Sequence, residues 1–211
     1  PPFSLEPNVY VQSTAGFVRG RYTFEELLEL WPRKTRNIGF YDYFSVWLWD
    51  FDQLPGGRAN DIDEVTRRIR EYARAGATSI SCESGNNWGV HGRGYYVASR
   101  LMWNPEEDVD ALLADFYNTA FGPAAEPARR FYERFDGGTQ PLMSEHLLAL
   151  GFRDLHKASQ FASGRADILA RLAHLKQYLH YVRVRWDLDH LPKSDVAARK
   201  QLTLDGLTWC Y

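Results

Sequence analysis

A helical pattern lies between two runs of β-type sequence, Ile38-Gly39-Phe40-Tyr41-Asp42-Tyr43-Phe44 and Thr78-Ser79-Ile80-Ser81-Cys82. Asp61 stands at the N-cap of this helix, Glu64 is at its third position, and Gly76 follows its end. The apolar residues of the helix recur every three or four positions, at Ile62, Val65, Ile69 and Tyr72. The segment therefore predicts two strands joined by a helix, a connection long enough for parallel strands.

The same order extends toward the N-terminus. Residues 8–13 predict a strand, and the capping-box spacing of Thr23-Phe24-Glu25-Glu26 opens a helix to about Trp31. Beyond Cys82 the pattern becomes helical, and we predict helices over 94–103, 105–122, 123–135, 144–163 and 166–188, with a last segment from 194. We therefore expect an α/β domain over residues 1–103 and an all-α region over residues 104–211.

Three βα units are too few to close a barrel. They match in size the last three units of a TIM-type (β/α)8 barrel whose first five units lie upstream, and the abrupt start at Pro1 favours this interpretation. The alternative is a self-contained three-stranded layer covered by helices. The apolar end at Leu207 to Tyr211 also predicts a fragment of a longer chain. A partial barrel leaves apolar sheet edges exposed, so self-association is a further expectation.

Composition excludes several classes of protein. The 211 residues carry a formal charge of −2, and 45% of them are hydrophobic, which rules out a disordered chain and gives no basic surface for nucleic acid. No apolar stretch reaches membrane-span length. The histidines lack metal-ligand spacing, and no Gly-Lys-Ser/Thr follows the glycines after Glu83, so we expect no metal and no cofactor. The unusual fraction is the 15% of aromatic residues.

Polar and aromatic residues gather where the predicted strands end. The carboxyl ends of parallel strands meet at one edge, and carboxylates, amides and indoles together are typical of a sugar site. We predict catalytic carboxylates at Glu83, Asp50 and Asp42. Candidate substrate contacts are Tyr41, Trp47, Trp49, Asn87, Trp88, His91 and Arg93.

Each of these residues also has a structural interpretation. Asp42 lies within a predicted strand, where an ion pair explains it as well as substrate contact does. Glu83 can pair with Arg93, Asp50 can form a turn, and Trp47 and Trp49 can belong to the core. The glycines from Gly85 to Gly94 predict a loop, in which His91 would serve as a hydrogen-bonding group.

A family resemblance begins at the third strand. The motifs that carry it are Glu83-Ser84-Gly85, Asn87-Trp88-Gly89, Gly94-Tyr95-Tyr96, Ala98-Ser99-Arg100-Leu101-Met102-Trp103-Asn104, Asp108-Val109-Asp110-Ala111-Leu112-Leu113 and Phe121-Gly122-Pro123-Ala124-Ala125-Glu126-Pro127. They resemble an uncharacterised-domain family of large bacterial proteins, with barrels similar to α-glucuronidases and β-hexosaminidases. The resemblance covers Asn37 to about Leu188 and is most specific from Trp103 to Pro127.

The resemblance implies a (β/α)8 barrel followed by helices and a role in polysaccharide breakdown outside the cytoplasm, in the periplasm or the extracellular space. It implies that the general acid follows the fourth strand, upstream of Pro1, and that Glu83 follows the eighth. We therefore expect part of a glycoside hydrolase acting on a polysaccharide or oligosaccharide, with acidic ones among the candidates. The alternatives are a non-catalytic carbohydrate-binding protein and a structural helical module that binds a partner.

Overall fold

The structure is a computed structural model, and it describes residues 5–15, 18, 20–45, 58–85, 88–136 and 143–210, of which 209 and 210 are described by their backbone alone. The chain divides into two compact units. The N-terminal unit reaches to Leu112, and the C-terminal unit runs from Leu113 onward. Each unit is described by itself below.

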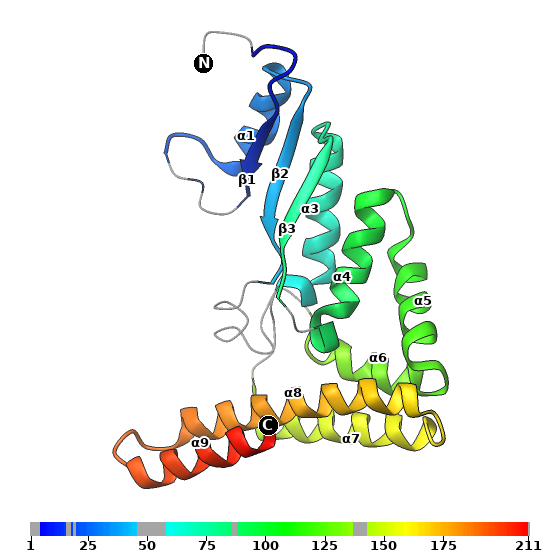
Figure 1. The fold of residues 1–211 in the computed structure, drawn as a ribbon, viewed down its shortest axis with the longest axis vertical. Coiled ribbons are helices and arrows are strands. Elements are labelled where there is room, and N and C mark those ends of the chain that lie inside the picture. Colours follow the sequence, from blue (N-terminus) through cyan, green and yellow to red (C-terminus); the bar gives the residue numbers. More distant parts are fainter. Residues whose placement is uncertain are drawn as a thin grey trace. The chain divides into compact units, whose positions relative to one another are not determined.

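The N-terminal unit is built on a parallel sheet of three strands in the order β1-β2-β3 (Figure 1). The strands are β1 (Val11–Thr14), β2 (Ile38–Tyr43) and β3 (Ser79–Glu83). Helix α1 (Phe24–Leu30) and the short 3-10 helix η1 (Trp31–Arg33) connect the first two strands, and α3 (Ile62–Arg74) lies between the last two. Thr23 and Asp61 cap α1 and α3 as the sequence predicts. The α/β part of the predicted fold class is thus confirmed.

Both connecting helices cover the same face of the sheet. Phe40 of β2 stacks on Tyr72 of α3 with ring centroids 4.7 Å apart, and Phe24 of α1 meets both rings edge-on. Ile38 completes this buried cluster, and Ile80 of β3 packs against it. Apolar burial of these aromatic and branched side chains stabilises the unit on this face, which we call the helix face.

The opposite face of the sheet carries polar side chains. Side chains alternate along a strand, so the neighbours of Phe40 point away from the helices. These positions include Gln12, Thr14, Gly39, Tyr41, Tyr43, Ser79, Ser81 and Glu83, and we call them the open face. The tyrosines are half-buried, whereas Gln12, Thr14, the serines and Glu83 are exposed. Within the described residues, this parallel sheet therefore packs against helices on one face only.

Tyr10 crosses the amino-terminal end of the open face. Its hydroxyl contacts the Ser79 hydroxyl on β3, so the side chain spans β2 at Gly39. A Cβ atom at Gly39 would overlap the Tyr10 hydroxyl, which explains why this strand position has no side chain.

Helix α4 (Trp88–Trp103) overturns one sequence expectation. The predicted helix over 94–103 is confirmed, but it begins earlier, at Trp88, so the loop predicted at Gly89 and Gly92 is wrong. Gly94 packs against the 3-10 helix η2 (Arg58–Asn60), where a Cβ atom would overlap the carbonyl oxygen of Ala59. Close backbone approach, rather than a turn, explains that glycine.

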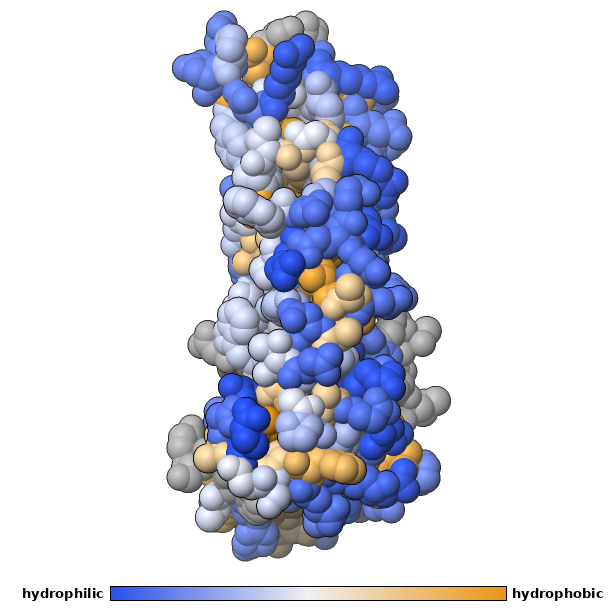
Figure 2. All heavy atoms as spheres, turned by 90° about the vertical axis from the view of Figure 1, so that its right-hand side faces the viewer, coloured by the Kyte–Doolittle hydropathy of each residue, from blue (hydrophilic) through white to orange (hydrophobic). Residues whose placement is uncertain are grey.

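The remaining helices match the predicted all-α region in number and order within the described residues. Their bounds are α5 (Val109–Phe121), η3 (Gly122–Ala124), α6 (Ala125–Glu133), α7 (Glu145–Phe161), α8 (Ala166–His190) and α9 (Val196–Cys210). Because α5 spans Leu112, it belongs to both units. Figure 2 shows one side of the molecule as a largely hydrophilic surface with apolar residues in small patches.

Buried contacts define the C-terminal unit. The Asp154 carboxylate on α7 accepts a 2.5 Å hydrogen bond from Arg134, directly after α6, and Arg130 of α6 lies 3.5 Å away. Gly151 brings α7 close to Leu179 of α8. The apolar side chains of α8 that recur every three or four residues are buried at Ile168, Leu172, Leu175, Leu179 and Val182. Among the described residues, no helix combines the length and apolar character that membrane crossing requires.

Candidate functional site

Tyr41 and Glu83 meet at the carboxyl end of the open face. The Tyr41 hydroxyl donates a 2.7 Å hydrogen bond to Glu83 Oε1. Tyr41 is paired with Ser81 in the sheet register, and Glu83 is paired with Tyr43, so the bond runs diagonally between neighbouring strands. The Glu83 side chain is exposed at this edge and is accessible to a ligand.

The backbone of Glu83 is held as well. Its carbonyl oxygen accepts hydrogen bonds from the amide groups of Phe44, at 3.0 Å, and Ser45, at 3.4 Å. These bonds continue the β2–β3 pairing past the end of β2. The carboxylate therefore extends from a fixed main chain and is not carried by a free loop.

The hydrogen bond also changes the chemistry of Tyr41. Donation to Glu83, with smaller contributions from burial and from the negative charge nearby, raises the pKa of the Tyr41 phenol above its ordinary value. The ring of Tyr43 packs edge-on against Tyr41, with centroids 5.4 Å apart and planes at 76°. Tyr41 is thus a protonated donor braced by a second aromatic ring.

Trp88 offers an exposed aromatic surface at the start of α4. Its side chain is 64% exposed, and its ring meets Tyr95 edge-on at 4.9 Å. The Tyr95 hydroxyl accepts a hydrogen bond from the Gly85 amide at 3.1 Å and ties α4 to the segment that follows β3. Sequence reasoning missed this role of Tyr95, although its spacing of seven residues from Trp88 places both rings on one helix face.

Asp42 lies on the helix face and is completely buried. Its carboxylate accepts hydrogen bonds from Arg68 at 2.8 and 3.1 Å, from the Tyr72 hydroxyl at 2.5 Å and from the Tyr43 amide at 2.8 Å. Arg58 lies 3.7 Å away. The sequence left two interpretations of Asp42 open, an ion pair and substrate contact. The structure contains the ion pair.

The pKa of Asp42 reflects these contacts. Burial favours the neutral acid, but the hydrogen bonds from Arg68 and Tyr72 and the charge of Arg68 outweigh burial, so the pKa lies below its ordinary value. In the same region, burial raises the pKa of the Cys82 thiol to about 12, which leaves it protonated and unreactive at neutral pH.

Two further predicted contacts are also in the interior. His91 and Arg93 are each 1% exposed on α4, and the Arg93 guanidinium donates to the Asn60 carbonyl oxygen at 3.0 Å. Arg93 also does not form the predicted pair with Glu83, whose carboxylate is bound by Tyr41.

Four predicted site residues lie outside the described residues. They are the candidate carboxylate Asp50 and the candidate contacts Trp47, Trp49 and Asn87. In the part of the chain that the structure describes, no group of three or more His, Cys, Asp or Glu side chains has the arrangement that a metal ion requires.

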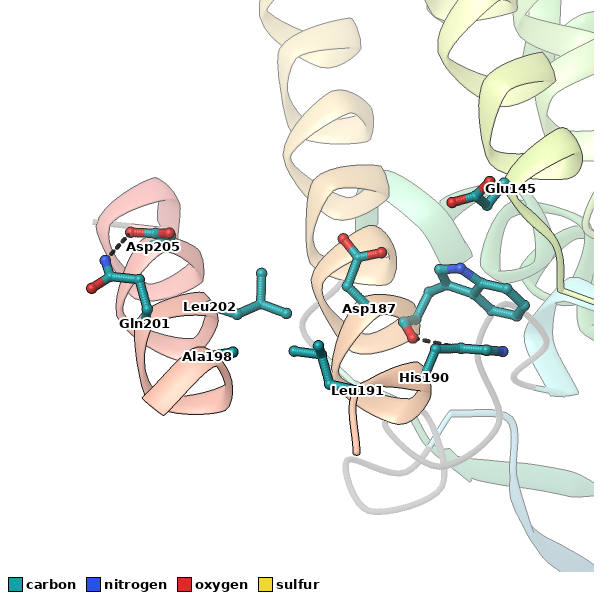
Figure 3. A pocket seen from close by; sticks show the side chains of 9 residues that line it. Glu145, Asp187, His190, Leu191, Ala198, Gln201, Leu202 and Asp205 are labelled. Atoms are coloured by element: carbon teal, nitrogen blue, oxygen red, sulfur yellow. Dashed lines mark hydrogen bonds between the residues drawn. The ribbon is translucent and has the colours of Figure 1, made fainter. Parts of the chain in front are cut away.

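The C-terminal unit contains an open groove of about 750 Å³ (Figure 3). Trp186, Asp187, His190 and Leu191 line it from the end of α8 and the residue that follows, and Leu202 lies on the α9 side. The other lining residues are Glu145, Ala198, Gln201 and Asp205. Asp187 pairs with Arg183 at 2.8 Å, and His190 Nδ1 lies 2.8 Å from the Trp186 carbonyl oxygen. Gln201 donates to Asp205 at 2.8 Å, and Glu145 lies 3.7 Å from Arg183 of α8. The polar groups of this groove are thus already bound by other protein groups, and the candidate site remains the edge at Glu83.

Comparisons with known proteins place the chain in a family. Neither the search of curated proteins nor the search of solved structures gave a significant match. A family model described as "Domain of unknown function (DUF4838)" matches residues 7–134, which is more than half of the chain and covers the sheet, α1, α3, α4, α5 and α6. The chain therefore belongs to the DUF4838 family.

Proposed function

We propose that this chain carries the sugar-binding, carboxylate-bearing edge of a glycoside hydrolase-like protein that acts on a polysaccharide or oligosaccharide. The observation that carries the proposal is the exposed Glu83 carboxylate, held by Tyr41 at the carboxyl end of a parallel sheet. Functional groups in parallel α/β folds gather at this end of the strands.

The surroundings of Glu83 support a sugar as the ligand. Tyr43 and Trp88 offer aromatic surfaces close to the carboxylate or just after β3, and aromatic rings pack on the apolar faces of sugar rings. Thr14 and Ser81 add exposed hydroxyl groups to the open face, which can exchange hydrogen bonds with sugar hydroxyls.

The sheet topology supports our proposal that the unit is part of a TIM-type (β/α)8 barrel. The strands are parallel and follow in chain order, and α1 and α3 cover the same face. Successive βα units of a barrel have this arrangement, whereas a doubly wound sheet has helices on both faces. In a barrel, the open face would point inward and Glu83 would stand at the mouth.

The resemblance to α-glucuronidases and β-hexosaminidases supports the choice of substrates to test. Aryl α-glucuronides and aryl N-acetyl-β-hexosaminides are suitable because an aryl leaving group departs without a general acid. On the same resemblance we propose that the protein acts outside the cytoplasm, in the periplasm or the extracellular space, on a polysaccharide, with acidic polysaccharides among the candidates.

The test is turnover of these aryl glycosides by the full chain and by Glu83→Gln. We expect Glu83→Gln to lose at least about a hundredfold in turnover, the scale of one general acid–base group. Glu29→Gln is the matched control, because Glu29 is an exposed glutamate on α1, which packs on the helix face. Equal activity of Glu83→Gln and the wild-type chain would contradict the proposal.

A second candidate function is carbohydrate binding without catalysis. Glycoside hydrolysis usually requires two carboxylates, and among the described residues of the open face Glu83 is the one carboxylate. Titration calorimetry with glucuronic acid and N-acetylglucosamine oligosaccharides distinguishes the two functions. Binding that Glu83→Gln weakens, without turnover of any aryl glycoside, would favour this alternative.

A further inference from the structure

The contact between Tyr41 and Glu83 indicates that the two residues have different roles in the proposed site. We propose that Tyr41 is a positioning residue, which holds Glu83 as a proton-accepting carboxylate instead of contacting the sugar itself. This inference rests on the proposed function and assigns Glu83 the role of general base in it.

The geometry fixes one oxygen of the carboxylate. Tyr41 donates its hydroxyl proton to Glu83 Oε1 at 2.7 Å, and the ring of Tyr43 braces Tyr41 from the same strand. The Glu83 main chain is bound by the Phe44 amide at 3.0 Å. With Oε1 engaged, Oε2 is the oxygen that remains to accept a proton from a reacting water.

The phenol keeps the donor role over a wide pH range. The hydrogen bond to Glu83 raises the pKa of Tyr41, so the phenol stays protonated at neutral and mildly alkaline pH. A carboxylate with one oxygen engaged by a donor presents its other oxygen as an acceptor, which is the role of a general base.

Glu83 acts in the step in which water displaces the leaving group from the sugar. Glu83 Oε2 takes a proton from water while the water oxygen bonds to the anomeric carbon and the bond from that carbon to the glycosidic oxygen breaks. With an aryl glycoside the leaving group departs as the aryl oxide, so no further proton is needed. Tyr41 retains its own proton throughout and acts only through the direction of the carboxylate.

A double-mutant cycle on the full chain distinguishes positioning from sugar contact. The variants are Tyr41→Phe, Glu83→Gln and the double substitution, measured on the aryl glycosides above. We expect Tyr41→Phe to lower kcat about tenfold, the scale of one hydrogen bond to a charged group, with KM within about twofold of the wild-type value. In the Glu83→Gln background the same substitution should have no further effect.

Tyr22→Phe is the matched control, because Tyr22 is exposed in the β1–α1 connection. It should leave kcat and KM unchanged. A Tyr41→Phe variant with wild-type kcat and raised KM would overturn the proposal, since that pattern indicates direct sugar contact. Losses that add in the double variant would overturn it as well.

A spectrophotometric titration of the tyrosines tests the coupling without any substrate. One phenol should titrate at lower pH in Glu83→Gln than in the wild-type chain, and that phenol should be missing from Tyr41→Phe. If the wild-type chain turns over no aryl glycoside, the proposed function fails and this titration alone decides the inference. Identical titrations of the wild-type chain and Glu83→Gln would overturn it.

Discussion

The two faces of the sheet hold two carboxylates in opposite environments. Asp42, on the helix face, is completely buried and is bound by Arg68, Tyr72 and a backbone amide. Glu83, on the open face, is exposed and accepts a hydrogen bond from Tyr41. In the sheet register Glu83 pairs with Tyr43, the residue that follows Asp42. The two environments are therefore one strand position apart.

The comparison shows that strand alternation, and not residue type, sets the role of each acid. Adjacent positions on a strand face opposite sides of the sheet, so a shift by one residue moves a side chain from the core to solvent. A charge that enters the core must be paired, and Arg68 supplies the pairing for Asp42. A charge on the open face remains available for a ligand.

Removing the buried acid should have the largest effect on stability. Asp42→Ala removes the main partner of the Arg68 guanidinium and leaves it the longer 3.4 Å contact with Glu64, so we expect a loss of about 3–5 kcal/mol in the free energy of unfolding. Urea denaturation followed by circular dichroism measures this loss. Asp63→Ala, at an exposed position of α3, is the control and should stay within about 0.5 kcal/mol of the wild-type chain. A loss for Asp42→Ala as small as that of the control would contradict the assignment of Asp42 to a stabilising buried ion pair.

Removing one donor from the same cluster should have a smaller effect. Tyr72→Phe keeps the ring that stacks on Phe40 and removes the hydroxyl that donates to Asp42. We expect a loss of about 1.5–3 kcal/mol in the same denaturation experiment, the range for a hydrogen bond to a charged group. An unchanged denaturation midpoint would show that the hydroxyl contributes nothing to the cluster.

Acid should weaken the helix face through Asp42. The pKa of Asp42 is lowered in the folded chain, while an unfolded aspartate titrates near pH 3.9. The stabilisation is therefore fully present above about pH 4 and is lost as the pH falls through the lower folded value. We expect Asp42→Asn, compared with the wild-type chain, to lose less stability between about pH 5 and pH 2 in thermal unfolding scans. Parallel curves for the two proteins would contradict this linkage.

The smallest effect on stability should come from the open face. Glu83→Ala removes an exposed carboxylate, so we expect the free energy of unfolding to change by no more than about 0.5 kcal/mol. The same urea denaturation measures it. A loss comparable to that of Asp42→Ala would show that Glu83 is a structural residue and would remove the contrast between the two faces.

Local sequence rules predicted the elements of the N-terminal unit well. The caps at Thr23 and Asp61 and the helical spacing from Ile62 to Tyr72 identified α1 and α3, because these signals depend on nearby residues alone. The first turns of α4, from Trp88 to Arg93, were missed because their glycines were interpreted as a loop, and Gly94 itself is required by a contact with Ala59, which is distant in sequence. Such a tertiary approach leaves no local signal.

The site was predicted only in part. Strand ends pointed to Glu83 and Tyr41, but their mutual hydrogen bond depends on the register of β2 and β3, which the residues do not specify locally. The opposite orientation of Asp42 follows from alternation once the strand bounds are known. The burial of His91 and Arg93 depends on the unexpected length of α4. The domain boundary after residue 103 and the self-association stay predictions.

The most direct test of the account measures stability and turnover on two conservative variants, Asp42→Asn and Glu83→Gln. We predict that Glu83→Gln keeps the melting temperature of the wild-type chain and loses aryl glycoside turnover. We predict that Asp42→Asn has a lower melting temperature and keeps its turnover per folded molecule. The assignment of function to the open face would be contradicted if Glu83→Gln kept wild-type turnover while folded Asp42→Asn lost it.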